Sequence, residues 1–256
     1  MVININKEKE IWNGIWGNIP ETITHKDIFY LMDEIKLEYL LDILPSPHEN
    51  IKVIEVGCGS ARLSCFLASL GYNTTCMDFS ENALKVAKKN YYLTKNQGEF
   101  IVGDVQNMPF EDNTYDVVIS TGLLEHFKDP QIVINEMTRI LKPEGIFYSD
   151  IVPDKFSLFR SHLLFLKKLN LWTDDEWYEI ELNKKDIITM LQSADLTDIN
   201  VFPAGVFIPQ LPFKISSLKK LEYKTVYKLK PLIKHVDNTR VAELLGFFYF
   251  AQAKKR

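Results

Sequence analysis

The sequence predicts a doubly wound α/β fold, in which helices cover both faces of a mostly parallel sheet. Short β-branched runs alternate with helical stretches through the middle of the chain, and this alternation is typical of βαβ units. Glycines interrupt the pattern at the ends of these runs, as they do where strands and helices meet. The 256 residues, 46% of them hydrophobic, are enough to build one sizeable core.

The apolar periodicity places seven strands and four helices in this fold. The strands are predicted at residues 51–56, 73–77, 99–103, 115–120, 145–151, 198–207 and 247–253. The helices are predicted at residues 60–70, 81–93, 130–141 and 184–196. Ser80 has the residue type and position of an N-cap for the second of these helices. Pro130 stands at a first-turn position that tolerates proline.

Charge and cysteine content exclude several classes of protein. A net charge of −4 is unlike that of a general nucleic-acid binder. No uncharged run approaches the roughly 18 residues of a membrane span, and Met1–Glu10 lacks the apolar stretch of a secretion signal. Cys58, Cys65 and Cys76 form no Cys-x-x-Cys pair, so neither a disulfide framework nor a thiolate zinc site is expected. The sequence therefore predicts a cytoplasmic protein.

A glycine loop follows the first strand of the predicted sheet. Gly57-Cys58-Gly59 lies where a strand ends and a helix begins, which is the place where open α/β sheets bind ligands. A dinucleotide fingerprint would require a third glycine where Arg62 stands. Glu55 would repel a pyrophosphate and attract an ammonium group. The loop is either an ordinary strand–helix turn or a site for a ligand without phosphates.

Three aspartates next to later strands favour a ligand site over an ordinary strand–helix turn. Asp78 follows the second strand, 19 residues after Gly59, where a carboxylate can accept the hydroxyl hydrogens of a ribose. Asp104 follows the third strand and could meet an adenine amino group. Asp116 opens the fourth strand. Each alone could be a turn or cap residue, but together, on one edge of the sheet, they predict an adenosine-shaped slot.

Five motifs in order over residues 50–151 carry a specific resemblance. They are EVGCGSARLS, CMDFS, GDVQNMPF, YDVVISTGLLEHF and RILKPEGIF. They resemble the motifs of class I S-adenosylmethionine-dependent methyltransferases, most closely the group that includes the ubiquinone and menaquinone methyltransferases. The resemblance implies a Rossmann-like fold and methyl transfer to O, N or C of a small-molecule acceptor by in-line displacement. S-adenosyl-L-homocysteine would be the product.

The same resemblance implies which residues hold the cofactor. They are Glu55, Gly57, Cys58, Gly59, Asp78, Phe79, Asp104, Val105, Thr121 and Leu123. The glycine loop would lie against the methionine part, and Asp78 would bind both ribose hydroxyls. Asp104 and Val105 would meet the adenine. Ala61 replaces the last glycine of the family's Gly-x-Gly-x-Gly pattern.

A catalytic group is marked less clearly than the cofactor site. Methyl transfer from a sulfonium mainly needs positioning of the reactants, and a base is required only for a protonated acceptor. His126 is the predicted base because it follows the fourth strand and has a suitable ordinary pKa. Alternatively, Glu125 and His126 shape the loop or bind a metal, although no metal site is predicted. His25, His162 and His235 are possible substitutes.

The remaining segments are interpreted as parts of one domain over residues 1–256. Residues 1–50 form an N-terminal helical cap, 51–151 the cofactor-binding core, 152–183 and 208–240 cap insertions, and 184–207 and 241–256 complete the sheet. Trp12 and Trp16 could form a lid over the cofactor or a helix docked by its aromatic side chains. The insertions are expected to determine the choice of substrate.

The C-terminal part is basic. Residues 208–256 contain eleven Lys and Arg and three acids, a net charge of +8, which leaves −12 on the rest. Such asymmetry is typical of proteins that bind an anionic substrate, a membrane surface or RNA, and it also occurs where basic helix faces are simply solvated. The expected partner is a small molecule, anionic or apolar, with membrane-surface contact as a possibility and no DNA. Alternatives are an RNA or protein methyltransferase, a non-catalytic S-adenosylmethionine-binding protein and a nicotinamide oxidoreductase.

Overall fold

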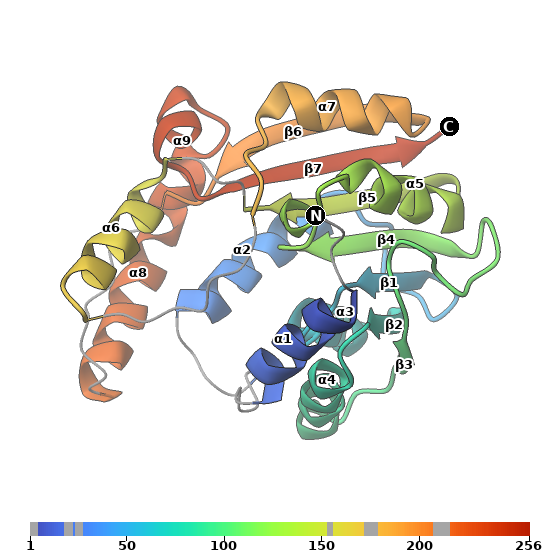
Figure 1. Cartoon of the computed structure of the whole chain (residues 1–256), viewed down its shortest axis with the longest axis horizontal. Helices are drawn as coiled ribbons and strands as arrows, with labels where there is room; N and C mark the ends of the chain where they lie inside the picture. Colours follow the sequence, from blue (N-terminus) through green and yellow to red (C-terminus); the bar gives the residue numbers. More distant parts are fainter. Residues whose placement is uncertain (1–4, 18–22, 24–27, 153–155, 172–178, 207–215) are drawn as a thin grey trace.

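A computed structural model of the chain contains one seven-stranded sheet in the order β3-β2-β1-β4-β5-β7-β6 (Figure 1). The structure describes every residue except 1–4, 18–22, 24–27, 153–155, 172–178 and 207–215. The strands are β1 (Lys52–Val56), β2 (Asn73–Asp78), β3 (Glu99–Val102), β4 (Tyr115–Thr121), β5 (Leu141–Ile151), β6 (Leu196–Ala204) and β7 (Phe248–Lys255). Strands β1 to β5 pair in parallel, and β7 runs antiparallel to β5 and β6. The predicted fold class is confirmed.

Helices cover both faces of the sheet. They are α1 (Ile5–Gly17), α2 (Ile28–Leu41), α3 (Arg62–Leu70), α4 (Glu81–Thr94), α5 (Pro130–Ile140), α6 (Leu158–Lys168), α7 (Lys184–Ser193), α8 (Ser216–Val236) and α9 (Arg240–Leu245), with a short 3-10 turn, η1 (Leu124–His126). One core cluster joins the sheet to α5 and α7, and a second joins it to α2, α3 and α8. Alternate residues of β4 enter the two clusters, because successive side chains of a strand point to opposite faces. No described helix is long and apolar enough to cross a membrane.

Local signals in the sequence account for most element boundaries. The Ser80 hydroxyl accepts a hydrogen bond from the Ala83 amide at 3.2 Å, as expected of an N-cap. The helix predicted from residue 60 begins at Arg62, because Ala61 adopts the left-handed conformation with φ of 51°. Strand β5 begins at Leu141, four residues before the predicted start, because Leu141 pairs with Tyr115 ahead of a register shift.

The region expected to be an insertion at residues 208–240 contains a long helix. Helix α8 packs Val226 and Ile233 into the second core cluster, although Pro231 lies within it. Its inward cations face helix α2. Lys234 lies 2.6 Å from a Glu38 carboxylate oxygen, and Lys230 also pairs with Glu38. Burial and these ion pairs hold the helix on the sheet, and a sequence pattern interrupted by proline does not reveal them.

Candidate cofactor and acceptor site

The carboxyl ends of the central strands meet at one edge of the sheet. In the parallel register, Val56 of β1 stands beside Met77 of β2, and Thr121 of β4 stands beside Asp150 of β5. The loops that follow these strands therefore converge. This edge is where open parallel α/β sheets bind their ligands.

The glycine loop at this edge has a backbone that only glycine adopts easily. Gly57 has a φ of 62° and Gly59 a φ of 51°. A Cβ on Gly57 would lie 2.5 Å from the Leu123 side chain, and one on Gly59 would lie 2.4 Å from the Trp16 ring. Cys58 is buried in the core beside this loop, and burial raises the pKa of its thiol. The two glycines thus let the Leu123 and Trp16 side chains approach the backbone of this loop, which we call the glycine cradle, and Cys58 is a packing residue.

Glu55 occupies the position where a pyrophosphate would bind in a dinucleotide fold. Its side chain is 1% exposed, and one carboxylate oxygen accepts hydrogen bonds from the Ser64 amide at 3.0 Å and the Ser64 hydroxyl at 2.5 Å. The other accepts one from the Thr121 hydroxyl at 3.3 Å. Burial raises the pKa of Glu55 to about 7. The Glu55 carboxylate already accepts the Ser64 amide in the first turn of α3. A phosphate bound at this helix terminus would therefore be repelled by the negative charge of Glu55.

Asp78 connects the glycine loop to the end of β2. One carboxylate oxygen accepts a hydrogen bond from the Gly59 amide at 2.9 Å, and the other accepts one from the Ser80 amide at 2.8 Å. The residue is 4% exposed, and burial raises its pKa. The Phe79 amide also hydrogen-bonds this carboxylate, and an ionised carboxylate has about four acceptor positions. Asp78 can therefore shape the loop and still accept a hydroxyl hydrogen from a ligand.

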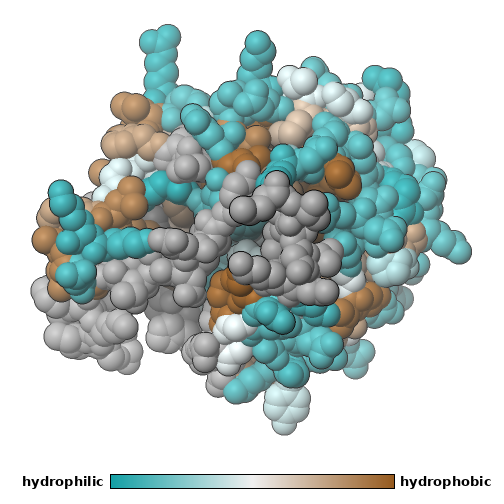
Figure 2. All heavy atoms as spheres, viewed as in Figure 1, coloured by the Kyte–Doolittle hydropathy of each residue, from teal (hydrophilic) through white to brown (hydrophobic). Residues whose placement is uncertain are grey.

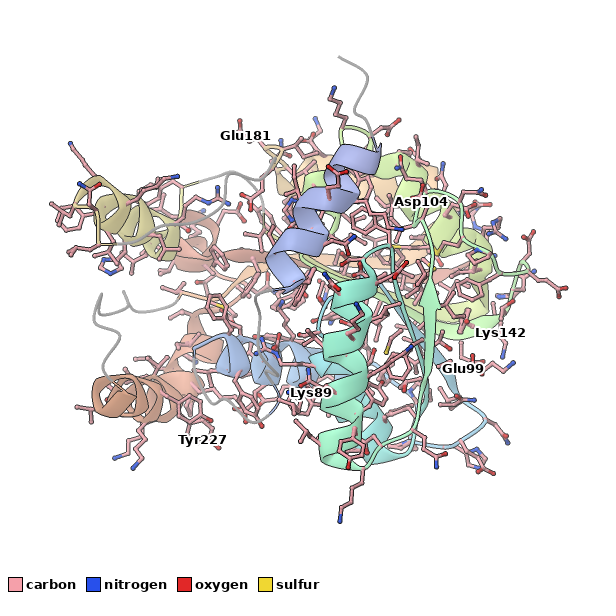
Figure 3. The ribbon with its side chains drawn as sticks, turned by 60° about the horizontal axis from the view of Figure 1, so that its bottom comes forward. Lys89, Glu99, Asp104, Lys142, Glu181 and Tyr227 are labelled. Atoms are coloured by element: carbon pink, nitrogen blue, oxygen red, sulfur yellow. The ribbon has the colours of Figure 1, made fainter. Side chains whose placement is uncertain are left out.

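The other two predicted aspartates have different positions. Asp104 lies in the loop after β3 (Figure 3) and its carboxylate accepts a hydrogen bond from the Gln106 amide at 2.9 Å. The neighbouring Val105 is 7% exposed. Asp116 is at the opposite edge of the sheet, where it accepts a hydrogen bond from the Lys52 amide at 2.9 Å and pairs with Lys142. The prediction that Asp116 shares the edge of the other acids is wrong, because it opens its strand and they follow theirs.

The loop after β4 carries the predicted base. His126 ends the 3-10 turn η1, and its ring meets the Trp12 ring edge-on, with centroids 5.2 Å apart. Glu125 points the other way: one carboxylate oxygen accepts a hydrogen bond from the Val152 amide at 3.0 Å. Burial raises the pKa of Glu125 to about 8. Glu125 thus fixes the loop against the end of β5, and His126 faces the N-terminal helix.

Helix α1 covers this edge of the sheet. Asn13 accepts a hydrogen bond from the Ser80 hydroxyl at 2.6 Å, and its carbonyl accepts one from the Asn82 side chain at 3.0 Å. Trp16 lies on Gly59, and Trp12 lies on His126. The helix is docked by its aromatic side chains and at the same time lies over the predicted site, so the two interpretations of these tryptophans are compatible.

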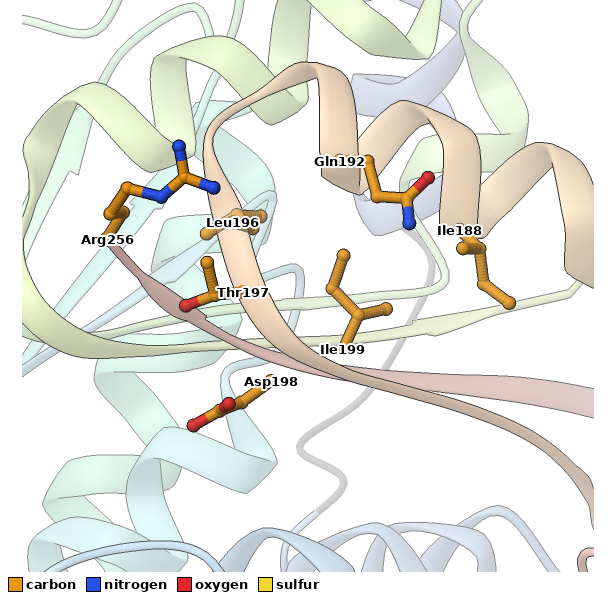
Figure 4. Close-up of a pocket in the computed structure, with 7 residues that line it drawn as sticks. All are labelled: Ile188, Gln192, Leu196, Thr197, Asp198, Ile199 and Arg256. Atoms are coloured by element: carbon orange, nitrogen blue, oxygen red, sulfur yellow. The ribbon is translucent and has the colours of Figure 1, made fainter.

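Two cavities lie at the opposite edge of the sheet, where its strands begin. One, of about 390 Å³, surrounds the amino end of β6 and includes Leu196 and Arg256 (Figure 4). Another, of about 640 Å³, surrounds the amino ends of β2 and β3 and includes Asn73 and Glu99. Neither contains a predicted site residue, and both are lined by groups without a shared chemistry.

Known proteins that are similar to this chain are methyltransferases. Residues 54–149 match the family described as "Methyltransferase domain". The chain is 35% identical over 122 residues to a ubiquinone biosynthesis O-methyltransferase from Nitrosomonas europaea, covering 47% of this chain and 52% of that protein. It is 30% identical over 174 residues to the protein of the same name from Xanthomonas oryzae pv. oryzae, covering 65% of this chain and 70% of the relative. The chain belongs to the S-adenosylmethionine-dependent methyltransferase family.

A solved methyltransferase shares the fold of this family member. An S-adenosylmethionine-dependent methyltransferase from Thermotoga maritima, described as a possible histamine N-methyltransferase, superposes with a TM-score of 0.57 at 16% identity. The alignment covers 98% of this chain and 96% of that one. The chain spans about half the length of the first curated relative, from N. europaea.

The residue types at this edge suit the family's cofactor. The buried carboxylates of Glu55 and Asp78 suit an ammonium group and ribose hydroxyls, and the side chains of Leu123 and Trp16 lie against the two glycines of the loop. Arg62, the cation nearest the loop in the sequence, is paired with Asp33 at 2.5 Å. The edge therefore presents acids to a cationic nucleoside.

Several residues at the candidate site were not predicted from the sequence. Ser64 binds Glu55, and Lys36 of α2 pairs with Asp150 at 2.9 Å beneath the loop after β4. His25 lies outside the described residues, and His235 is exposed at the end of α8. His162 lies on α6, the helix that follows β5. Among the described parts of the chain, no group of three or more His, Cys, Asp or Glu could hold a metal.

Proposed function

We propose that this protein transfers a methyl group from S-adenosylmethionine to a small-molecule acceptor, and that O is the acceptor atom. The observation that carries the proposal is that two buried carboxylates, Glu55 and Asp78, lie next to the glycine cradle at the sheet's carboxyl edge. The relatives named as O-methyltransferases favour oxygen over nitrogen or carbon. Their substrates, from ubiquinone biosynthesis, favour an apolar acceptor.

The cofactor, when bound, supplies an activated methyl group on a positive sulfur. Gly57, Cys58 and Gly59 would border its methionine part, with Glu55 near the ammonium group and Thr121 and Leu123 at the same end. The ribose would lie at Asp78 and Phe79, and the adenine at Asp104 and Val105. These residues bind and orient the reactant, while Trp12 and Trp16 on α1 exclude water from the edge.

Calorimetry tests the choice of cofactor. We expect S-adenosylhomocysteine to bind with a Kd on the order of micromolar and NAD not to bind, because Glu55 stands where the pyrophosphate would bind. Binding of NAD, or of neither ligand, would contradict the proposal.

His126 is proposed as the group that takes the proton from the acceptor hydroxyl. It lies at the carboxyl edge, partly exposed, and its ring is held against Trp12. The His126→Ala variant should lose about 100-fold in turnover of a phenolic probe acceptor. The turnover rate of this variant should also no longer change with pH over the range in which an imidazole titrates. His235→Ala, at the exposed end of α8, is the matched control and should behave like the parent. An unchanged profile for His126→Ala would remove His126 as the base.

The basic C-terminal segment is less available than its charge suggests. Lys230 and Lys234 pair with α2, Lys254 lies 3.7 Å from Asp198, and Arg256 lies 3.2 Å from Asp195. The side chains of Lys219 and Lys220 and all of Lys214 lie outside the described parts of the structure. Charge alone therefore does not support membrane contact through the whole of 208–256. Which lysines of this segment could contact a membrane depends on where their individual side chains lie.

A further inference from the structure

Helix α6 exposes apolar side chains on the face that does not touch the core. Leu166 is buried, with 3% exposed. On the outer face, Leu164 is 59% exposed and Phe165 58%. Lys168 is exposed beside them, and Leu169 and Leu171 continue the apolar surface beyond the helix. Packing of Leu163 against the second core cluster explains the inner face of α6 but not the outer one.

Helix α8 repeats this pattern. Its inner face buries Val226 and Ile233, and the cations on that side are neutralised by α2. An outer stripe follows the spacing of one helix face and consists of Leu221, Lys224, Lys228 and Leu232. Leu221 is 61% exposed and Leu232 60%. The cations of α8 thus form two groups, one engaged internally and one directed outward between exposed leucines.

The two outer faces lie at the same end of the molecule. Leu163 of α6 packs against the core cluster that contains Val226 and Ile233 of α8. Both helices lie at the same end of the molecule (Figure 1), and the view of Figure 3 shows them separated from each other. In Figure 2, brown apolar and teal hydrophilic spheres are interspersed at the left end, where α6 lies. We call this surface the α6–α8 face; it consists of Leu164, Phe165, Lys168, Leu169, Leu171, Leu221, Lys224, Tyr227, Lys228 and Leu232.

We propose that the α6–α8 face binds the surface of an anionic lipid membrane. Exposed leucines and aromatic rings insert at the boundary between headgroups and acyl chains, while lysines between them bind anionic headgroups. The exposed cations of the face are Lys168, Lys224 and Lys228, so the charge favours anionic over zwitterionic lipid. The proposal does not depend on the proposed methyl transfer.

Other occupants fit the same face less well. A second copy of the chain in a two-fold interface would bring the same patch against itself, so that Lys168, Lys224 and Lys228 would face like charges. RNA would match the lysines but leave the exposed leucines without an apolar partner. An anionic bilayer satisfies both kinds of side chain.

Vesicle cosedimentation of the full chain tests the proposal. The parent should bind phosphatidylcholine vesicles containing phosphatidylglycerol and bind pure phosphatidylcholine much more weakly. Neutralising the face with Lys168→Gln, Lys224→Gln and Lys228→Gln together should weaken binding to the anionic vesicles about 100-fold. Leu164→Ser with Leu232→Ser should weaken it as well, and this loss should persist at high salt, where screening has already reduced the ionic part.

A matched triple variant on another helix provides the control. Lys85→Gln, Lys88→Gln and Lys95→Gln remove the same charge from α4 and its C-cap and should leave vesicle binding unchanged. S-adenosylhomocysteine binding should be equal in all variants, which separates this proposal from the proposed function. Equal losses in both triple variants would overturn the proposal. So would RNA binding without vesicle binding, or a dimer that Leu164→Ser with Leu232→Ser dissociates while vesicles do not bind.

Discussion

Replacing Asp78 with alanine is expected to weaken S-adenosylhomocysteine binding by about 100-fold, because a ribose hydroxyl loses its hydrogen bond to a charged group. The carboxylate also holds the Gly59 and Ser80 amides at 2.9 and 2.8 Å, so its removal releases the cradle as well. Isothermal titration calorimetry measures the affinity, and thermal unfolding shows whether the variant is folded. Asp78→Asn keeps one acceptor oxygen and should lose less.

Asp116→Asn is the control for Asp78. It removes the same charge from the other edge of the sheet and keeps an oxygen for the Lys52 amide. Its affinity for S-adenosylhomocysteine should equal that of the parent. If Asp78→Ala bound as tightly as Asp116→Asn, the ribose would not lie at the end of β2, and the assignment of the cofactor site would fail.

The fold could be predicted because its signals are local. Each central strand is a short apolar run that ends at a turn residue. Ser80 marks the start of α4, because its hydroxyl caps the helix. Helix α8 could not be predicted in the same way. Pro231 interrupts its pattern, and its stability depends on burial of Val226 and Ile233 and on ion pairs with α2. Contacts between residues nearly 200 positions apart leave no periodic trace in a sequence.

The error in the predicted position of Asp116 has a simple geometric reason. In a parallel sheet, an acid that ends a strand and an acid that opens one lie at opposite edges. Asp78 is the last residue of β2, whereas Asp116 is the second residue of β4. The positions of Trp16 over Gly59 and of Ser64 against Glu55 depend on tertiary packing. The sequence marks the acids at the carboxyl edge better than the groups that hold those acids in place.

Helix α2 is tied to the site by buried charges. Lys36 is 9% exposed and its ammonium lies 2.9 Å from an oxygen of Asp150, which is fully buried. The Asp150 carbonyl accepts a hydrogen bond from the Gly122 amide at 3.0 Å. One turn earlier on α2, Asp33 pairs with Arg62 at the start of α3. The helix thus contacts the loop after β4 and the helix after the glycine loop.

Lys36→Met should therefore lower the free energy of unfolding by about 3–5 kcal/mol, because it leaves the Asp150 charge buried without a partner. In a chain of this size the melting temperature should fall by about 10 °C. Burial already raises the pKa of Asp150 even beside Lys36, and loss of the ammonium should raise it further. A folded-state pKa above the unfolded value favours the folded state at low pH. The destabilisation should thus be small below about pH 4 and grow as the pH rises. Urea unfolding at several pH values measures it.

Removing both charges separates electrostatics from packing. Lys36→Met with Asp150→Leu replaces the ion pair by apolar side chains, and such replacements are often neutral or stabilising. We expect the double variant to recover most of the lost stability and to lose the extra pH dependence of Lys36→Met. If the double variant were as unstable as the single one at every pH, the lysine would act through its packing on Phe248, whose ring centroid lies 4.9 Å from its ammonium. Recovery would show that charge balance under the β4 loop holds α2 in place.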